Sequence, residues 1–354
     1  MTLTAIDLFC GCGGLSLGLE QAGFRVIGAI DDDPLAVDSY KLNHKDTDAW
    51  VGDLSTLTTS NVKRRLGIRK GELDLLAGCP PCQGFSTLRS LNGGRKITEA
   101  KNDLVFDFLR FVVDLRPRAV MMENVPGLAV DERMQSLSDE LKRLGYKGTA
   151  RVLDAAEFGV PQRRRRMIYL ATRGRRPIPF PPPGTKRVTV HDVIAALPKA
   201  GSSGDPLHDV SETRSQKVTE LVKRIPKDGG SRRDLGDDQQ LDCHKRTNGF
   251  YDVYGRMAWL EVSPTITGGF VNPSKGRFLH PAEDRCITLR EGALLQGLPP
   301  DYAFSFDRGK YAVAQMIGNA LPPEFIRRHA AVVADALRMR KSTRAKAPRP
   351  RADR

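Results

Sequence analysis

Short apolar runs alternate with amphipathic segments over the first 172 residues, and this alternation constrains the fold more than any other feature. Apolar runs of this length are typical of strands, and the segments between them of helices. Repeated strand–helix units predict an α/β fold with a doubly wound, mostly parallel sheet, whose ligands bind beyond the carboxyl ends of the strands. The expected strands are residues 3–9, 25–30, 50–51, 73–77, 119–122, 149–153 and 167–172.

The alternation stops near residue 173, where residues 173–183 contain five prolines. The residues that follow are rich in Gly, Ser, Asp and Arg with little periodicity, which predicts a smaller, loop-rich domain. Helical patterning returns at 289–295 and in a last helix that ends near Met339. The predicted organisation is a large domain at 1–173, a small domain at 174–302, a return to the large domain at 303–339 and a disordered basic tail at 340–354.

The formal net charge of +14 indicates a polyanionic partner. Half of this charge lies in residues 338–354, which hold eight Lys or Arg and one Asp; a solubilising surface is the alternative explanation for that run. No apolar stretch approaches the roughly 20 residues of a membrane span, and no signal-peptide pattern opens the sequence. Six cysteines without regular spacing indicate a reducing compartment, so we expect a cytoplasmic protein without a membrane partner.

A glycine-rich turn, Phe9-Cys-Gly-Cys-Gly-Gly14, follows the first strand. Its glycines let backbone N–H groups approach a ligand, and the N-terminus of the next helix favours an anionic group. A dinucleotide fingerprint needs glycine where Ser16 stands, so a nicotinamide cofactor fits poorly. Asp31 ends the second strand, where a carboxylate can bind a ribose hydroxyl pair; a helix-capping carboxylate is the alternative.

Two cysteines flank two prolines in Gly78-Cys-Pro-Pro-Cys-Gln-Gly-Phe-Ser86, directly after the fourth strand. A redox pair needs its first cysteine at a helix start, which the prolines disfavour. A zinc site needs about four ligands, which the other cysteines and histidines supply poorly, so no metal is expected. One nucleophilic thiolate on a rigid turn remains. Its basic neighbours Arg89, Arg95 and Lys96 lie in a segment that also holds Asn-Gly-Gly and has the pattern of a mobile lid.

Glu123 ends the fifth strand, where it can serve as a general acid. The run Gln162-Arg-Arg-Arg-Arg166 leads into a later strand, so Arg164 and Arg166 share one face and the other two arginines share the opposite face. Such a run is ordinarily a basic surface. Its position in a strand that leads to the cleft favours a role in the site.

These motifs resemble, in their usual order, those of the DNA cytosine-5 methyltransferases. The resemblance spans residues 7–323, nearly the whole chain. It implies the Rossmann-like fold of S-adenosylmethionine-dependent methyltransferases, with a smaller target-recognition domain. The matching elements are the loop at 9–14, Pro81-Cys82-Gln83, Glu123-Asn124-Val125, Gln162-x-Arg164-x-Arg166, Arg290-Glu291 with Leu295-Gln296-Gly297, and Gln315-Met316-Ile317-Gly318-Asn319.

The resemblance implies a covalent mechanism on a cytosine that is flipped out of duplex DNA. Cys82 attacks C6, Glu123 hydrogen-bonds or protonates N3, and Arg166 with Arg164 holds the O2 side of the base. C5 then takes the methyl group of S-adenosyl-L-methionine, and loss of the C5 proton expels Cys82. Cys79 has no required role in this scheme.

The same resemblance implies a cofactor site in which Asp31 binds the ribose hydroxyls, Asp53 the adenine amino group, and Asn319 closes the pocket. The family usually has an apolar or aromatic residue after the ribose acid, where this chain has Asp32, so the register within residues 31–33 stays open. The implied cofactor-binding residues are Phe9, Gly11, Gly13, Gly14, Asp31, Asp53 and Asn319.

DNA binding is assigned to the recognition domain and to the segment after Cys82. Residues 254–267 are expected near a DNA groove, with a packed hairpin as the alternative. The expected DNA contacts are Gln83, Ser86, Arg89, Arg95, Lys96 and Arg256.

The expected protein is a monomeric, nucleoid-associated methyltransferase of double-stranded DNA, paired functionally with a cognate restriction endonuclease. The alternatives are a tRNA cytosine-5 methyltransferase of the same superfamily and a non-catalytic DNA-binding relative.

Overall fold

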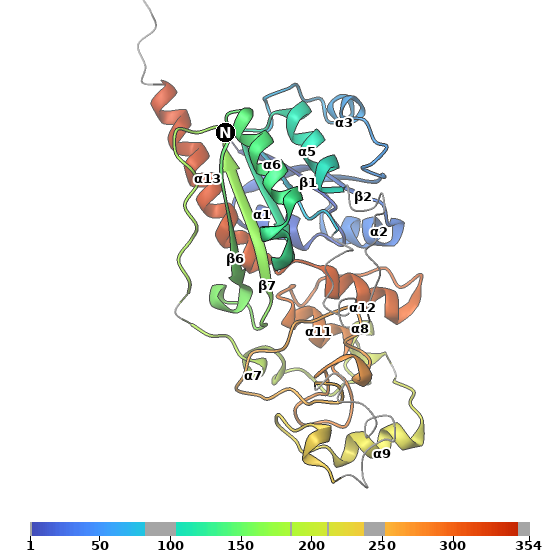
Figure 1. Cartoon of the computed structure of the whole chain (residues 1–354). Coiled ribbons are helices and arrows are strands. Elements are labelled where there is room, and N and C mark those ends of the chain that lie inside the picture. The colour runs from blue at the N-terminus through green and yellow to red at the C-terminus, as the bar shows by residue number, and fades with distance from the viewer. Residues whose placement is uncertain (1, 82–103, 185, 211, 237–251, 346–354) are drawn as a thin grey trace, which may run out of the picture.

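The computed structural model describes residues 2–81, 104–184, 186–210, 212–236 and 252–345, with side chains up to Met339. A seven-stranded sheet in the order β3-β2-β1-β4-β5-β7-β6 forms its centre (Figure 1). Strands β1 to β5 pair in parallel, whereas β7 is antiparallel to both β5 and β6, so the predicted doubly wound, mostly parallel sheet is confirmed. The strands are β1 Leu3–Leu8, β2 Phe24–Asp31, β3 Asp48–Val51, β4 Leu75–Gly78, β5 Ala119–Asn124, β6 Lys147–Asp154 and β7 Arg165–Thr172.

The helices that cover the sheet are α1 Gly14–Gln21, α2 Pro34–Asn43, α3 Thr59–Leu66, α5 Leu104–Leu115, α6 Glu132–Arg143 and α13 Pro323–Ala345. They form two layers because successive side chains of a strand point to opposite faces. In β5, Ala119 and Met121 share a core with α1 and α13. Val120 and Met122 share the other core with α5 and α6. All four side chains are fully buried, which makes β5 a central strand.

The last helix, α13, packs beside the first, α1, so the two ends of the described chain complete one layer (Figure 1). Gly18 permits this contact, because a Cβ there would lie 2.6 Å from both the Pro323 carbonyl oxygen and the Ile326 Cβ. The helix continues to Ala345, so the prediction that it ends near Met339 is wrong, whereas the basic disordered tail stays a prediction. Residues 346–354 lie outside the described residues.

The residues between β7 and α13 form loops and mostly short helices around a third hydrophobic core, to which Cys12, Leu35 and Ala36 also contribute. Their described part pairs only through isolated bridges, which agrees with the predicted loop-rich character. Figure 1 shows α11 and α12 between the sheet and α9. The domain boundaries stay predictions. The helices are α7 Val190–Ile194, α8 Pro206–Asp209, α9 Gln216–Arg224, α11 Leu289–Leu295 and α12 Gly309–Asn319. Among the described helices, none has both the length and the apolarity to cross a membrane.

Candidate active site

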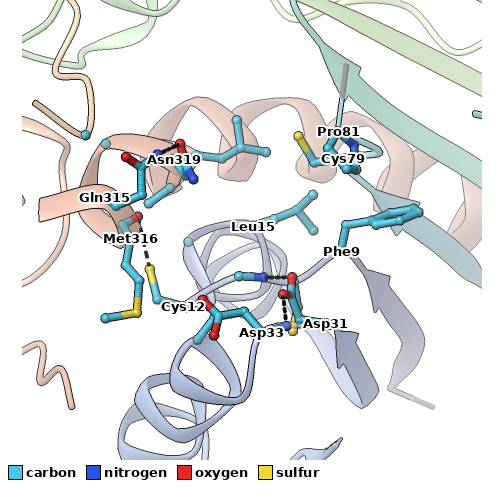
Figure 2. Close-up of a pocket in the computed structure, with 18 of the residues that line it drawn as sticks. Phe9, Cys12, Leu15, Asp31, Asp33, Cys79, Pro81, Gln315, Met316 and Asn319 are labelled. Atoms are coloured by element: carbon cyan, nitrogen blue, oxygen red, sulfur yellow. Dashed lines mark hydrogen bonds between the residues drawn. The ribbon is translucent and has the colours of Figure 1, made fainter. Parts of the chain in front are cut away.

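A cavity of about 810 Å³ lies at the carboxyl ends of β1, β2, β4 and β5, where a doubly wound sheet places its ligands. Its volume falls within the roughly 300–1,000 Å³ typical of small-molecule sites. Figure 2 shows Gln315, Met316 and Asn319 of α12 on one side of this cavity, with Phe9 and Cys79 on the other. The lining residues come from segments within 9–15, 31–36, 79–81, 123–125, 164–166, 265–268 and 308–321.

The glycine-rich turn after β1 forms one wall of the cavity. Phe9 has a φ of 62°, a conformation that is rare outside glycine and is often found at functional sites. Gly11 and Gly13 also have positive φ, of 52° and 104°. A Cβ on Gly14 would lie 2.4 Å from the carbonyl oxygen of Leu321, so only glycine lets the turn pack against the segment after α12.

Asp31, at the end of β2, holds this turn by a hydrogen bond. Its Oδ2 accepts a hydrogen bond from the Gly11 backbone N–H at 2.8 Å, and its Oδ1 accepts one from Asp33 N at 3.0 Å. Burial raises the pKa of the Asp31 carboxyl group, against these two hydrogen bonds, which lower it. Asp33, whose Oδ1 accepts from Leu35 N, is the N-cap of α2. The capping role weighed for Asp31 therefore belongs to Asp33, and Asp31 lines the cavity.

A buried acid beneath the turn was missed by the sequence reasoning. Asp7 is fully buried, and its Oδ2 accepts a 2.7 Å hydrogen bond from Ser16 Oγ, which in turn accepts one from Tyr40 Oη. Burial raises the pKa of Asp7 to about 8. The only signal in the sequence was a charged residue inside an otherwise apolar strand.

The Pro-Pro turn is held by the motif that ends β5. Asn124 Nδ2 donates to the Pro80 carbonyl oxygen at 2.8 Å, and Asn124 Oδ1 accepts from Val125 N at 2.8 Å. On the other side, Cys79 N donates to the Leu8 carbonyl oxygen at 3.2 Å. The turn therefore has a set position up to Pro81. The predicted nucleophile Cys82 and the predicted DNA contacts Gln83, Ser86, Arg89, Arg95 and Lys96 lie outside the described residues and stay predictions.

Glu123 is buried at the centre of the site, with 1% of its surface exposed. Its Oε1 forms an ion pair with Arg166 Nε at 2.8 Å, and its Oε2 accepts a 2.5 Å hydrogen bond from the Cys79 thiol. The structure thus brings together two of the residues predicted to be catalytic. It also brings Cys79, which had no required role in the predicted scheme, into contact with Glu123.

Arg164 lines the cavity and also contacts its backbone. It is buried, and its two terminal nitrogens donate to the carbonyl oxygens of Ile266 and Gly318, both at 3.0 Å. Burial lowers the pKa of its guanidinium to about 9. Arg164 thus joins two segments of the cavity wall, and its contact with the O2 side of a base stays a prediction. The predicted alternation is confirmed, since Arg163 and Arg165 are both exposed.

Two buried glutamines connect motifs that are far apart in the sequence. Gln162 Nε2 donates to Gln296 Oε1 at 2.6 Å, and Gln162 Oε1 accepts from Ile266 N at 3.0 Å. Gln296 Nε2 in turn donates to the Ala320 carbonyl oxygen. Both side chains are fully buried. The motif positions were visible in the sequence, but their pairing was not.

Of the two remaining residues predicted to bind the cofactor, Asn319 lines the cavity and Asp53 does not. Asn319 lines the cavity, and its Oδ1 accepts a 3.0 Å hydrogen bond from Gln315 Nε2 (Figure 2). Asp53 is exposed and is not among the residues that line the described cavity. Its Oδ1 accepts hydrogen bonds from both the backbone and the hydroxyl of Ser55, at 2.9 and 2.6 Å. Contact of Asp53 with an adenine amino group stays a prediction.

Arg256 requires a correction. It was expected to contact DNA, but its side chain is fully buried. Its guanidinium forms an ion pair with Asp284 at 2.5 Å. It also donates to the carbonyl oxygens of Val222, Ile225, His280 and Glu283. Because no part of the Arg256 side chain is exposed, it does not reach a DNA groove.

Comparisons with known proteins found matches along most of the chain. The family model of C-5 cytosine-specific DNA methylases matches residues 3–334. The type II methyltransferase M1.HphI of Haemophilus parahaemolyticus is 34% identical over 91% of this chain and 84% of its own length. The type II methylase M.HgiDII of Herpetosiphon aurantiacus is 33% identical over 91% and 92%.

Solved structures match the fold. The S. pombe Dnmt2 methyltransferase superposes with a TM-score of 0.60 at 19% identity, over 95% of this chain and 99% of that one. The Entamoeba histolytica methyltransferase EhMeth gives 0.63 at 15% identity, with the same coverage.

Proposed function

The chain belongs to the C-5 cytosine-specific DNA methylase family, and from this membership we propose how its residues methylate a cytosine in duplex DNA. The protein is a DNA (cytosine-5)-methyltransferase. The observation that carries the residue assignment is the meeting of separate motifs at one cavity. The glycine turn, the Pro-Pro turn, Glu123 and Arg166 all line it.

The proposed cofactor is S-adenosyl-L-methionine, and the residues present fit it. A Cβ at Gly11 would meet no atom within 4 Å, so the backbone of the turn is open to a close ligand. Carboxylates of residues 31–33 line the same cavity and suit a ligand with a sulfonium charge. When bound, the cofactor supplies an electrophilic methyl group. Phe9, Gly11, Gly13, Gly14, Asp31 and Asn319 would hold it.

The proposed nucleophile is Cys82, which follows Pro81 by one peptide bond. C5 of cytosine is too weakly nucleophilic to take a methyl group unaided. When the Cys82 thiolate bonds to C6, the ring becomes enamine-like and electron density rises at C5. Glu123 hydrogen-bonds or protonates N3, which relieves the negative charge that builds on the ring. The O2 side of the base is assigned to Arg166, and its ion pair with Glu123 supports this assignment.

The cycle closes by elimination. C5 gains the methyl group and still carries its original proton. A water or hydroxide takes that proton, the electrons of the C5–H bond re-form the C5–C6 double bond, and the bond between C6 and Cys82 breaks. N3 returns its proton or hydrogen bond to Glu123, so the enzyme regains its starting state. Because Glu123 is buried, a base reaches it only after leaving the duplex stack.

The proposed substrate is double-stranded DNA read by the loop-rich residues 174–302, in a restriction–modification context with a cognate endonuclease. Two relatives named as type II methyltransferases or methylases support this context. We propose a monomer that acts in the cytoplasm on the nucleoid. A tRNA substrate is the second candidate, because the covalent chemistry would be the same.

The test is incubation of the purified protein with cofactor labelled in the methyl group and with either duplex DNA or tRNA. Label in C5 of DNA cytosines is expected, and label in tRNA alone would refute the proposal. Duplex DNA with 5-fluorocytosine at the target should form a covalent adduct with the wild type. Cys82→Ser should bind the cofactor but form no adduct; an adduct in that variant would show that another residue is the nucleophile.

A further inference from the structure

The thiol of Cys79 lies inside the site and not beside it. Cys79 directly follows β4, and its backbone is tied to Leu8. Its side chain packs against the core cluster beneath α1 and α13 and also lines the cavity. From this position Sγ donates to Glu123 Oε2 at 2.5 Å.

Both carboxylate oxygens of Glu123 therefore have a partner, one through an ion pair and the other through a hydrogen bond. Arg166 Nε contacts Oε1 at 2.8 Å, and the Cys79 thiol contacts Oε2. The terminal torsion of a glutamate side chain is broad, so a single contact would leave the carboxylate plane free to turn. Two contacts from different directions set that plane, and each oxygen keeps a lone pair for a further partner.

The chemistry of the thiol fits a donor role. Burial, followed by the negative charge of Glu123, raises the pKa of the Cys79 thiol well above its usual range. The thiol therefore keeps its proton at neutral pH and donates to the carboxylate, and it is a poor nucleophile.

We propose that Cys79 is a positioning residue that sets the orientation of the Glu123 carboxylate toward the target base. This inference rests on the proposed action of Glu123 at N3. If the carboxylate rotates so that its oxygen atoms shift by a fraction of an ångström, it stabilises the transition state much less. Substrate binding changes little.

The test compares Cys79→Val, which keeps an apolar side chain without a donor, with Cys79→Ser, which keeps a donor. Single-turnover methylation of duplex DNA should slow roughly fivefold to tenfold in Cys79→Val, the factor expected for losing one hydrogen bond of ordinary strength, since a thiol is a weak donor. Cys79→Ser should stay within about twofold of wild type. Dissociation constants for cofactor and DNA should be unchanged in both variants. Cys286→Val, at a buried cysteine of the hydrophobic core formed mainly by the residues between β7 and α13, is the matched control and should keep the wild-type rate.

Three outcomes overturn the proposal: a wild-type rate in Cys79→Val, an equal loss in Cys79→Ser, or a loss confined to binding. If Cys79→Val does not fold, as judged by its thermal transition, Cys79→Ala replaces it. If the wild type itself fails to methylate DNA, the proposed function fails; if it methylates and Cys79→Val matches it, only this inference fails. Under the proposal, adding Cys79→Val to Glu123→Gln should slow that variant less than it slows the wild type.

Discussion

The side-chain amide of Asn124 donates to the carbonyl oxygen of Pro80 at 2.8 Å, across a sequence separation of 44 residues. This bond joins the end of β5 to the turn that leads into Cys82. Since Glu123 is the neighbour of Asn124, one strand end orients both the acid proposed to act on N3 and the backbone that carries the proposed nucleophile.

Asn124→Asp should slow methylation by loosening this turn. The variant keeps an acceptor for Val125 N but loses the donor to Pro80, and it places a carboxylate against a carbonyl oxygen. We expect the single-turnover rate to fall by about tenfold or more. Cofactor affinity, measured by calorimetry, should hold. A variant with wild-type rate would show that the prolines alone determine the turn.

Arg166→Gln should be far more damaging than Arg165→Gln. Arg166 pairs with buried Glu123, whereas Arg165 is exposed on the opposite face of the strand. We expect Arg166→Gln to lower the methylation rate roughly a hundredfold. The free energy of unfolding should fall by about 3 kcal/mol, since a buried carboxylate loses its partner. Equal rates for the two variants, with stability followed in guanidinium chloride, would contradict the assignment.

Arg256→Met should lower the free energy of unfolding and leave the salt dependence of DNA affinity unchanged. The variant loses the contacts to Asp284 and to four carbonyl oxygens, so we expect the free energy of unfolding to fall by about 3 kcal/mol. The slope of log affinity against log salt should match wild type, because no phosphate contact is removed. Arg224→Met, exposed at the end of α9, serves as the surface control for stability. A shallower salt slope in Arg256→Met would restore the original DNA-contact prediction.

Asp7→Asn should become relatively more stable as pH rises. Burial raises the pKa of Asp7 to about 8 in the folded state, whereas an unfolded aspartate titrates near ~3.9. Between these values the folded protein binds a proton that the unfolded chain has lost, so wild-type stability falls as pH increases through about 4 to 8. Asparagine removes this titration and can still accept from Ser16.

The measurement is urea unfolding of wild type and Asp7→Asn at about pH 5 and about pH 8. The variant's free energy of unfolding minus that of wild type should be larger at the higher pH. Asp38→Asn, at an exposed position of α2, is the matched control. A difference that does not change with pH would show that Asp7 does not titrate in this range.

Much of the fold followed from local pattern. Apolar runs bounded by turns predicted the strands. The side chains of β5 show why, because successive residues pack alternately into the two cores on opposite faces of the sheet. The antiparallel placement of β7 beside β5 was not visible, because strand direction depends on how the connection crosses the sheet. The extension of α13 to Ala345 was also missed, since basic composition hides a helix when apolar periodicity ends.

The sequence by itself determined the motifs from which the proposed chemistry is assigned, because Pro81-Cys82-Gln83, Glu123 and the arginine run stand in the order in which they resemble the family's motifs. Only the tertiary structure decided what each side chain touches. Arg164 and Arg166 look equivalent in sequence, yet one is bound by backbone carbonyls and the other by Glu123. Burial and partner choice arise from segments that meet only after folding, so the sequence alone does not reveal which contacts each arginine or cysteine makes.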